Sequence, residues 1–137
     1  MKQIILLFLL SIIGLPALAD TYVCEQEQVS YMELSLDIVG DFRAGPSPQV
    51  SYVVNGKGVK SLDGGSVLFE SCKPNEKNAL FLCERNVPQT TANSPEILSS
   101  FRINKGGGFS YVSHVYDLAW AQESHAIFMG KCHKIES

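Results

Sequence analysis

Hydrophobic and polar residues alternate along much of the chain after its first 20 positions. Between Met32 and Ile38 every even position is hydrophobic, whereas the odd positions carry Glu33, Ser35 and Asp37. A period of two predicts a β-strand with one buried and one solvated face. Similar or shorter apolar stretches predict further strands at residues 50–54, 67–72, 79–84, 101–103, 109–115 and 126–135.

Segments rich in glycine, proline and asparagine separate these stretches. Turn sequences stand at 55–56, 63–65 and 105–108, and a polar loop with two prolines is expected at 86–95. Residues 117–125 are expected to form an irregular link. The pattern therefore predicts an all-β fold, a small antiparallel β-barrel or sandwich of about seven to eight strands.

The first 19 residues have the layout of a secretory signal peptide. Lys2 precedes an apolar run from Ile4 to Leu15, and Ala17-Leu18-Ala19 is a small-x-small cleavage site. The run is about 12 residues long, and a helix that crosses a bilayer needs roughly 20. We expect a signal peptide at 1–19, a single β domain at 20–137, no membrane anchor after cleavage, and a periplasmic or secreted location.

Four cysteines lie in the expected mature domain. An even number in a small exported domain predicts two disulfides, and four cysteines allow three pairings. We favour Cys72–Cys83 together with Cys24–Cys132. A hairpin centred between residues 77 and 78 would place the first pair on opposite strands, and the second pair would join the two ends of the domain.

The charge balance narrows the classes of partner. Removing 19 of the 137 residues leaves 118, with 10 basic and 14 acidic side chains and a net charge of −4. This balance argues against nucleic acid and anionic membrane surfaces as partners. Segment 20–41 holds six of the acids and no Lys or Arg. These acids form either a solvated strand face or a patch for a cationic partner. Glu25, Glu27, Glu33 and Asp37 are the candidate binding residues of such a patch.

No catalytic residues, metal ligands or cofactor are predicted. Cys132-His133, with His114 and His125 nearby, lacks the short paired spacing of zinc motifs, so the histidines are expected to be surface or half-buried strand residues. A cysteine nucleophile needs a free thiolate, which disulfide pairing removes. On a strand, Ser110 and His114 would lie about 13 Å apart, beyond hydrogen-bond reach.

The candidate binding aromatics are Tyr116 and Trp120. They flank a link that is too polar to be core throughout, and Tyr and Trp often anchor interfaces. Alternatively, Trp120 folds back and closes one end of the barrel.

The C-terminal part of the chain carries a resemblance. The residues that carry this resemblance are Phe101-Arg102-Ile103, then glycines and Phe109, then Ala126 to Cys132. Together they resemble the ending of many small exported bacterial proteins without an assigned function. The overall plan is also similar to periplasmic inhibitors of c-type lysozyme, which are small exported β-barrels with disulfides. Those inhibitors usually carry a Ser-Gly-rich loop before a tyrosine, and residues 63–66 are a poor counterpart, so no functional residue is transferred.

These observations lead to one favoured function and two alternatives. We expect a non-enzymatic binding or inhibitor protein that contacts another exported protein through loops on a disulfide-linked β scaffold. The alternatives are a carrier that holds a small apolar molecule inside the barrel and a hydrolase that acts on the cell wall.

Overall fold

The computed structural model describes residues 20–34, 43–46, 49–75, 79–117, 119 and 121–135. The expected signal peptide, Asp37 and Trp120 lie outside the described residues. The described chain is all-β, with ten strands: β1 (Thr21–Leu34), β2 (Arg43–Pro46), β3 (Ser51–Asn55), β4 (Gly58–Ser61), β5 (Val67–Phe69), β6 (Lys73–Asn75), β7 (Ala79–Val87), β8 (Glu96–Asn104), β9 (Gly108–Asp117) and β10 (Gln122–Ile135).

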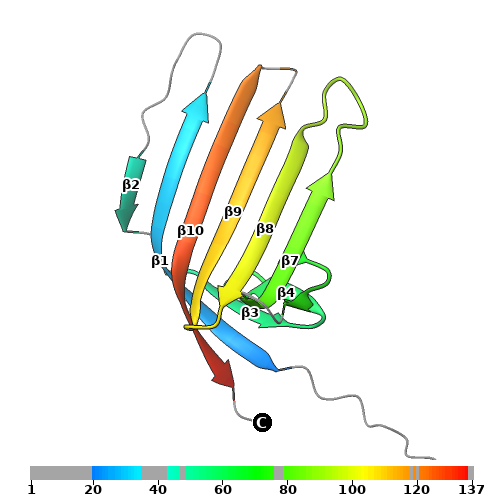
Figure 1. The fold of residues 1–137 in the computed structure, drawn as a ribbon. Helices are drawn as coiled ribbons and strands as arrows, with labels where there is room; N and C mark the ends of the chain where they lie inside the picture. Colours follow the sequence, from blue (N-terminus) through cyan, green and yellow to red (C-terminus); the bar gives the residue numbers. More distant parts are fainter. Residues whose placement is uncertain are drawn as a thin grey trace, which may run out of the picture.

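All ten strands belong to one curled antiparallel sheet. Its order is β5-β4-β3-β1-β10-β9-β8-β7-β6, and β2 pairs with β1 beside β3. Strands β1, β10, β9, β8 and β7 stand side by side, and β3 and β4 cross behind their lower ends (Figure 1). The sheet therefore curls into a half-barrel at its lower end only. The predicted fold class is confirmed, although ten described strands replace the expected seven or eight.

The hydrophobic core lies within the curled lower end. Tyr52 meets Phe101 and Phe109 with ring centroids 5.7 and 5.8 Å apart, and Phe101 stacks on Phe109 at 5.0 Å. Burying such a ring stabilises the fold by about 1.5–3 kcal/mol. The buried hydrophobic residues are Tyr22, Cys24, Tyr52, Val54, Val59, Phe69, Cys72, Phe81, Cys83, Phe101, Ile103, Phe109 and Cys132.

Both predicted disulfides are present. Cys24 and Cys132 are cross-strand partners of β1 and β10 and form one bond, and Cys72 is bonded to Cys83. The second pair is positioned by the β6–β7 hairpin, in which Lys73 pairs with Leu82. Continued by one residue, that register sets Cys72 opposite Cys83, and the expected hairpin centre at 77–78 lies outside the described residues.

A bulge in β1 changes which residues face the core. The register between β1 and β10 shifts between Gln26 and Gln28, so one extra residue stands in β1. Beyond the bulge, Glu33 lies on the same sheet face as the core, and Met32 and Leu34 lie on the opposite face. Met32, Glu33 and Leu34 are all half-buried, so the expected division of this strand into a buried and a solvated face is not seen here, and the inserted residue exchanges which side chains share the core side.

Five strands are longer than the hydrophobic pattern predicts, and one of them, β1, begins at Thr21 instead of residue 32. β7 continues to Val87 and β8 begins at Glu96, so the connecting loop is shorter than 86–95 and the 101–103 strand starts earlier. β9 reaches Asp117 and β10 begins at Gln122, so the link expected at 117–125 shrinks to residues 118–121. These polar segments adopt strand structure because their backbones pair with neighbouring strands, which outweighs local composition.

Candidate functional site

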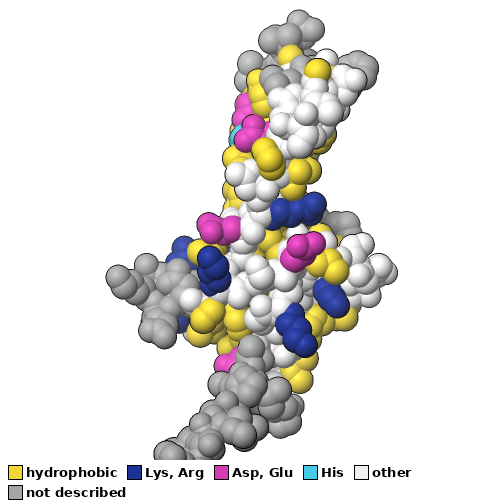
Figure 2. Space-filling model, turned by 90° about the vertical axis from the view of Figure 1, so that its right-hand side faces the viewer, with side chains coloured by type: hydrophobic (Ala, Val, Ile, Leu, Met, Phe, Trp, Pro, Cys, Tyr) yellow, Lys and Arg dark blue, Asp and Glu magenta, His cyan; other side chains and the backbone are white. Residues whose placement is uncertain are grey.

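Five strands continue beyond the core as a sheet extension. Only Ser30 and Ser99 are buried in this part, and its other side chains are half-buried or exposed. Seen from the side of β7, it is a narrow slab above a broader lower part (Figure 2). The sheet extension comprises residues 29–34, 84–87, 96–100, 111–117 and 122–129.

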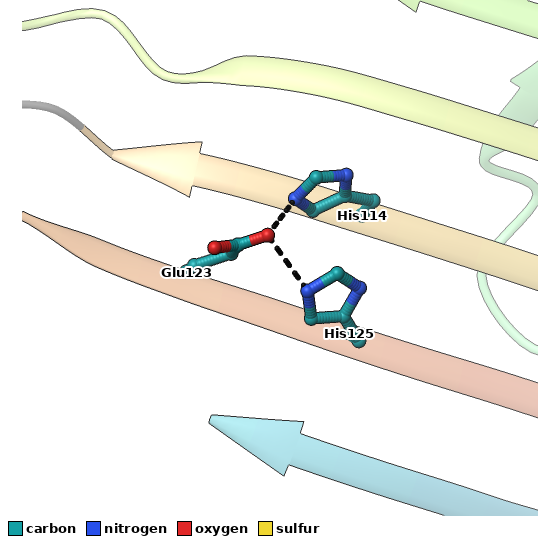
Figure 3. A group of neighbouring side chains, drawn as sticks. All are labelled: His114, Glu123 and His125. Carbon is teal, nitrogen blue, oxygen red and sulfur yellow. Dashed lines mark hydrogen bonds and ion pairs between the residues drawn. The ribbon is translucent and has the colours of Figure 1, made fainter. Parts of the chain in front are cut away.

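The outer face of the sheet extension, opposite to the core side, carries a cluster of two histidines and one glutamate. His114 of β9 and His125 of β10 are direct cross-strand partners, and Glu123 precedes His125 by two residues on the same face. The Nε2 atoms of both histidines lie 2.8 Å from Oε1 of Glu123 (Figure 3). The two rings stack with centroids 4.2 Å apart.

The two histidines differ in how they contact Glu123. His125 Nε2 donates a hydrogen bond to Glu123 Oε1 at 2.8 Å. His114 Nε2 is shielded from solvent and lies 2.8 Å from Glu123 Oε1 as an ion-pair contact, and no hydrogen bond of this atom is found among the described residues. The three side chains are only 30–33% exposed. Glu123 Oε1 is therefore the shared partner of both Nε2 atoms, and the three polar atoms face one another.

Hydrophobic residues surround the cluster on the same face. In the cross-strand register, Leu98 lies beside His114, and Met32 lies beside His125. Val112 and Ile127 form the next row toward the core, and Tyr116 lies beside Glu123. Polar groups within an apolar ring interact in a lower effective dielectric than bulk water.

The outer face also carries acids but no described Lys or Arg. Glu84, Glu96 and Glu123 lie on it. In Figure 2, acidic side chains and a histidine lie among hydrophobic ones on the left of the upper part. Leu98 and Val112 line a shallow depression of about 540 Å³, together with Glu84, Arg85 and His114.

The described acids of segment 20–41 lie apart from one another in the structure. Glu25 is exposed opposite Lys131, and Glu27 at the bulge forms an ion pair with Lys131 at 3.5 Å. Glu33 lies on the other face, where it contacts Gln122 and accepts a hydrogen bond from Tyr31 at 3.1 Å. These described acids do not form one patch.

Tyr31 and Tyr116 occupy opposite faces of the sheet extension. Burial, followed by the hydrogen bond and the charge of Glu33, raises the pKa of Tyr31 above its usual value. Tyr116 is 37% exposed on the outer face, at the end of β9. Of the two predicted aromatic binding residues, only Tyr116 is described, and it lies next to the histidine–glutamate cluster.

The sequence analysis missed this cluster because it searched for short ligand spacing along the chain. The local signal is Glu123-Ser124-His125, which places an acid and a histidine on one face of a strand. The third member, His114, joins them only through the β9–β10 register. A search for such alternating pairs next to a hairpin would have found it.

Comparisons with protein families, curated proteins and solved structures found no match to this chain. Within the described part of the chain, no helix has the length and hydropathy needed to cross a membrane. The fold and the site define an all-β, disulfide-linked protein with a sheet extension. Its two disulfides indicate an oxidising environment.

Proposed function

We propose that this chain is an exported, non-enzymatic binding protein, and that the outer face of its sheet extension contacts a basic surface of another exported protein. The signal-like segment 1–19 and the two disulfides support export to the periplasm or beyond. The observation that carries the proposal is the single-layer sheet extension, whose outer face is partly apolar although no described core lies against it.

The exposed hydrophobic residues support a protein partner. Leu98, Val112, Tyr116 and Met129 are 36–40% exposed and lie on one face. Clustered exposed apolar side chains with a polar border are typical of protein interaction surfaces. Because strands hold these side chains, little conformational entropy is lost when a partner binds.

The charges on this face support a basic partner. Its acids, Glu84 and Glu96, stand near the apolar residues, and the described residues of the sheet extension place no Lys or Arg on this face; Arg102 and Lys131 lie on the same sheet face just beyond it. Complementary charges steer association and select partners. The acidic face proposed here replaces segment 25–41, because Lys131 neutralises part of that segment.

The core packing favours this function over an apolar-ligand carrier. Aromatic rings in the curled lower end contact each other at centroid distances of 5.0–6.4 Å. Such rings fill the space in which a barrel-type carrier would hold its ligand.

A capture experiment tests the proposed surface. Immobilised mature protein is incubated with periplasmic extract, in parallel with a Leu98→Ser/Val112→Ser variant and a Leu62→Ser control. Leu62 is 55% exposed but lies outside the sheet extension. We expect proteins that the wild type and the control retain and the double variant loses, with at least about tenfold weaker binding. Identical capture by all three proteins would contradict the proposal.

The resemblance to inhibitors of c-type lysozyme makes such a lysozyme the first purified partner to test. A c-type lysozyme is titrated with the wild type and with a Glu84→Gln/Glu96→Gln variant, and inhibition is measured at low and high salt. We expect inhibition that weakens in the variant and at high salt, because screening reduces attraction between exposed charges. Salt-independent inhibition that both proteins share would contradict the charged surface proposed here.

A further inference from the structure

We propose that His114, Glu123 and His125 form a binding site for a divalent transition metal, and that Zn²⁺ is the metal class that this donor set fits. The site would add metal binding to the proposed function and does not depend on a partner. It rests on the positions of three side chains in the isolated chain.

The donor geometry is close to that of a metal site. One ligand atom from each of the three residues lies within 4.8 Å of the other two, and each Nε2 is 2.8 Å from Glu123 Oε1. Zinc is bound at about 2.0–2.2 Å by imidazole and carboxylate, so neighbouring ligands in a tetrahedral site lie roughly 3.3 Å apart. To admit the ion, each of the two histidine–glutamate contacts needs to lengthen by about half an ångström.

The donor chemistry selects the class of metal. Two imidazole nitrogens and one carboxylate oxygen suit zinc and its transition-metal neighbours, whereas Ca²⁺ and Mg²⁺ prefer oxygen ligands. The Nε2 of His114 is shielded from solvent, makes no described hydrogen bond and lies 2.8 Å from Glu123 Oε1, a position that suits a metal ligand. Three protein ligands leave a further position for water or another group, as in open zinc sites.

The sheet holds the ligands in place before a metal arrives. His114 and His125 are on β9 and β10, and each of these strands is paired on both sides in the sheet. The stacked rings and the neighbouring Leu98 and Met32 restrict the imidazoles. An apolar surrounding also limits solvent access to the ion and affects the pKa of water bound to it.

A zinc titration of the whole mature protein tests the site. The protein is stripped with a chelator, dialysed and titrated with Zn²⁺ against a chromophoric competitor that reports free metal. We expect one Zn²⁺ per chain in the wild type. We expect His114→Gln, His125→Gln and Glu123→Gln to bind it at least about 100-fold more weakly, because even groups that only orient a ligand are worth about 10- to 100-fold. Glutamine keeps the polar character of these positions.

The third histidine of the chain supplies a matched control. His133 is exposed on β10 and lies outside the cluster, so His133→Gln should retain the wild-type affinity and stoichiometry. Circular dichroism and thermal unfolding of the metal-free proteins identify any variant that does not fold. If glutamine at one of the three cluster positions prevents folding, the variants at the other two positions still test the site.

Three outcomes would overturn the metal site: no Zn²⁺ binding by the folded wild type, equal binding by the cluster variants, or loss of binding in His133→Gln. Binding of Ca²⁺ or Mg²⁺ in preference to Zn²⁺ would also contradict the donor argument. Co²⁺ as a spectroscopic probe should give the visible absorption of a low-coordinate site in the wild type and lose it in His125→Gln. None of these measurements uses a partner protein, so their failure is distinct from failure of the proposed binding function.

Discussion

Replacing Tyr52 with phenylalanine should remove a pH-dependent part of the stability of the core. Tyr52 is 4% exposed, and its hydroxyl donates a hydrogen bond to Oε1 of Gln26 at 2.5 Å. Burial, with smaller contributions from Tyr111 and Asp63, raises the pKa of Tyr52 from 10.0 to about 12. The folded protein therefore holds the phenolic proton more tightly than the unfolded chain does.

The magnitude follows from proton linkage. A difference between 10.0 and about 12 in pKa corresponds to about 2.7 kcal/mol, at about 1.4 kcal/mol per pKa unit. Because the folded pKa is the higher one, this stabilisation is complete below pH 10 and is lost as the pH rises through about 12. Near pH 7 the phenylalanine variant should be less stable by about 1–3 kcal/mol, because buried Gln26 loses one hydrogen-bond partner.

Urea unfolding of the wild type and of Tyr52→Phe, at intervals between pH 7 and about 11.5, tests this reasoning. The other titrating groups are common to both proteins, so the difference between the two free energies of unfolding isolates Tyr52. That difference should shrink by up to about 1.4 kcal/mol per pH unit above pH 10. Two curves that stay parallel over the whole range would refute the burial argument.

Two further predictions concern the junction between β1 and β10. A methyl group at Gly130 would lie 1.9 Å from the carbonyl oxygen of Glu25, whereas nothing lies within 4 Å of one at Gly45. Gly130→Ala should therefore lower the free energy of unfolding, measured with urea, by about 3 kcal/mol or more, whereas Gly45→Ala should change it by less than about 0.5 kcal/mol. Equal effects would contradict the close packing. The Cys24→Ser/Cys132→Ser variant opens a loop with a sequence separation of 108, against 11 for the other disulfide. Its free energy of unfolding should fall by up to about 4.7 kcal/mol, which is more than the roughly 3 kcal/mol expected when the Cys72–Cys83 bond is removed in the same way. A larger loss for Cys72–Cys83 in the same assay would refute the loop-entropy account.

Local sequence patterns determined the class of fold and the covalent framework. In the strand expected at 109–115, every second residue shares a face, and the register places Phe109, Tyr111, Ser113 and Val115 on the core side of β9. A strand's side chains alternate by simple backbone geometry, so this can be seen from the order of residues alone. The Cys72–Cys83 pairing was equally accessible, because a short hairpin fixes which residues are opposite each other.

The extent and orientation of the strands depended on partners far away in the chain. The bulge between Gln26 and Gln28 has no distinctive residue, yet it transfers Met32 to the outer face and Glu33 to the core side. Polar residues such as Gln122 and Ser124 belong to a strand because β1 and β9 pair with them on both sides. Pairing energy of this kind is a property of the assembled sheet.

By itself, the sequence determined an all-β fold with two disulfides, because strand periodicity and the cysteine pairs depend on local residue order and on covalent bonding, and it predicts a signal peptide at residues 1–19. Only the tertiary structure decided that the sheet continues beyond its core and that His114 meets Glu123 and His125. The physical reason is that cross-strand register brings together residues that no spacing along the chain connects.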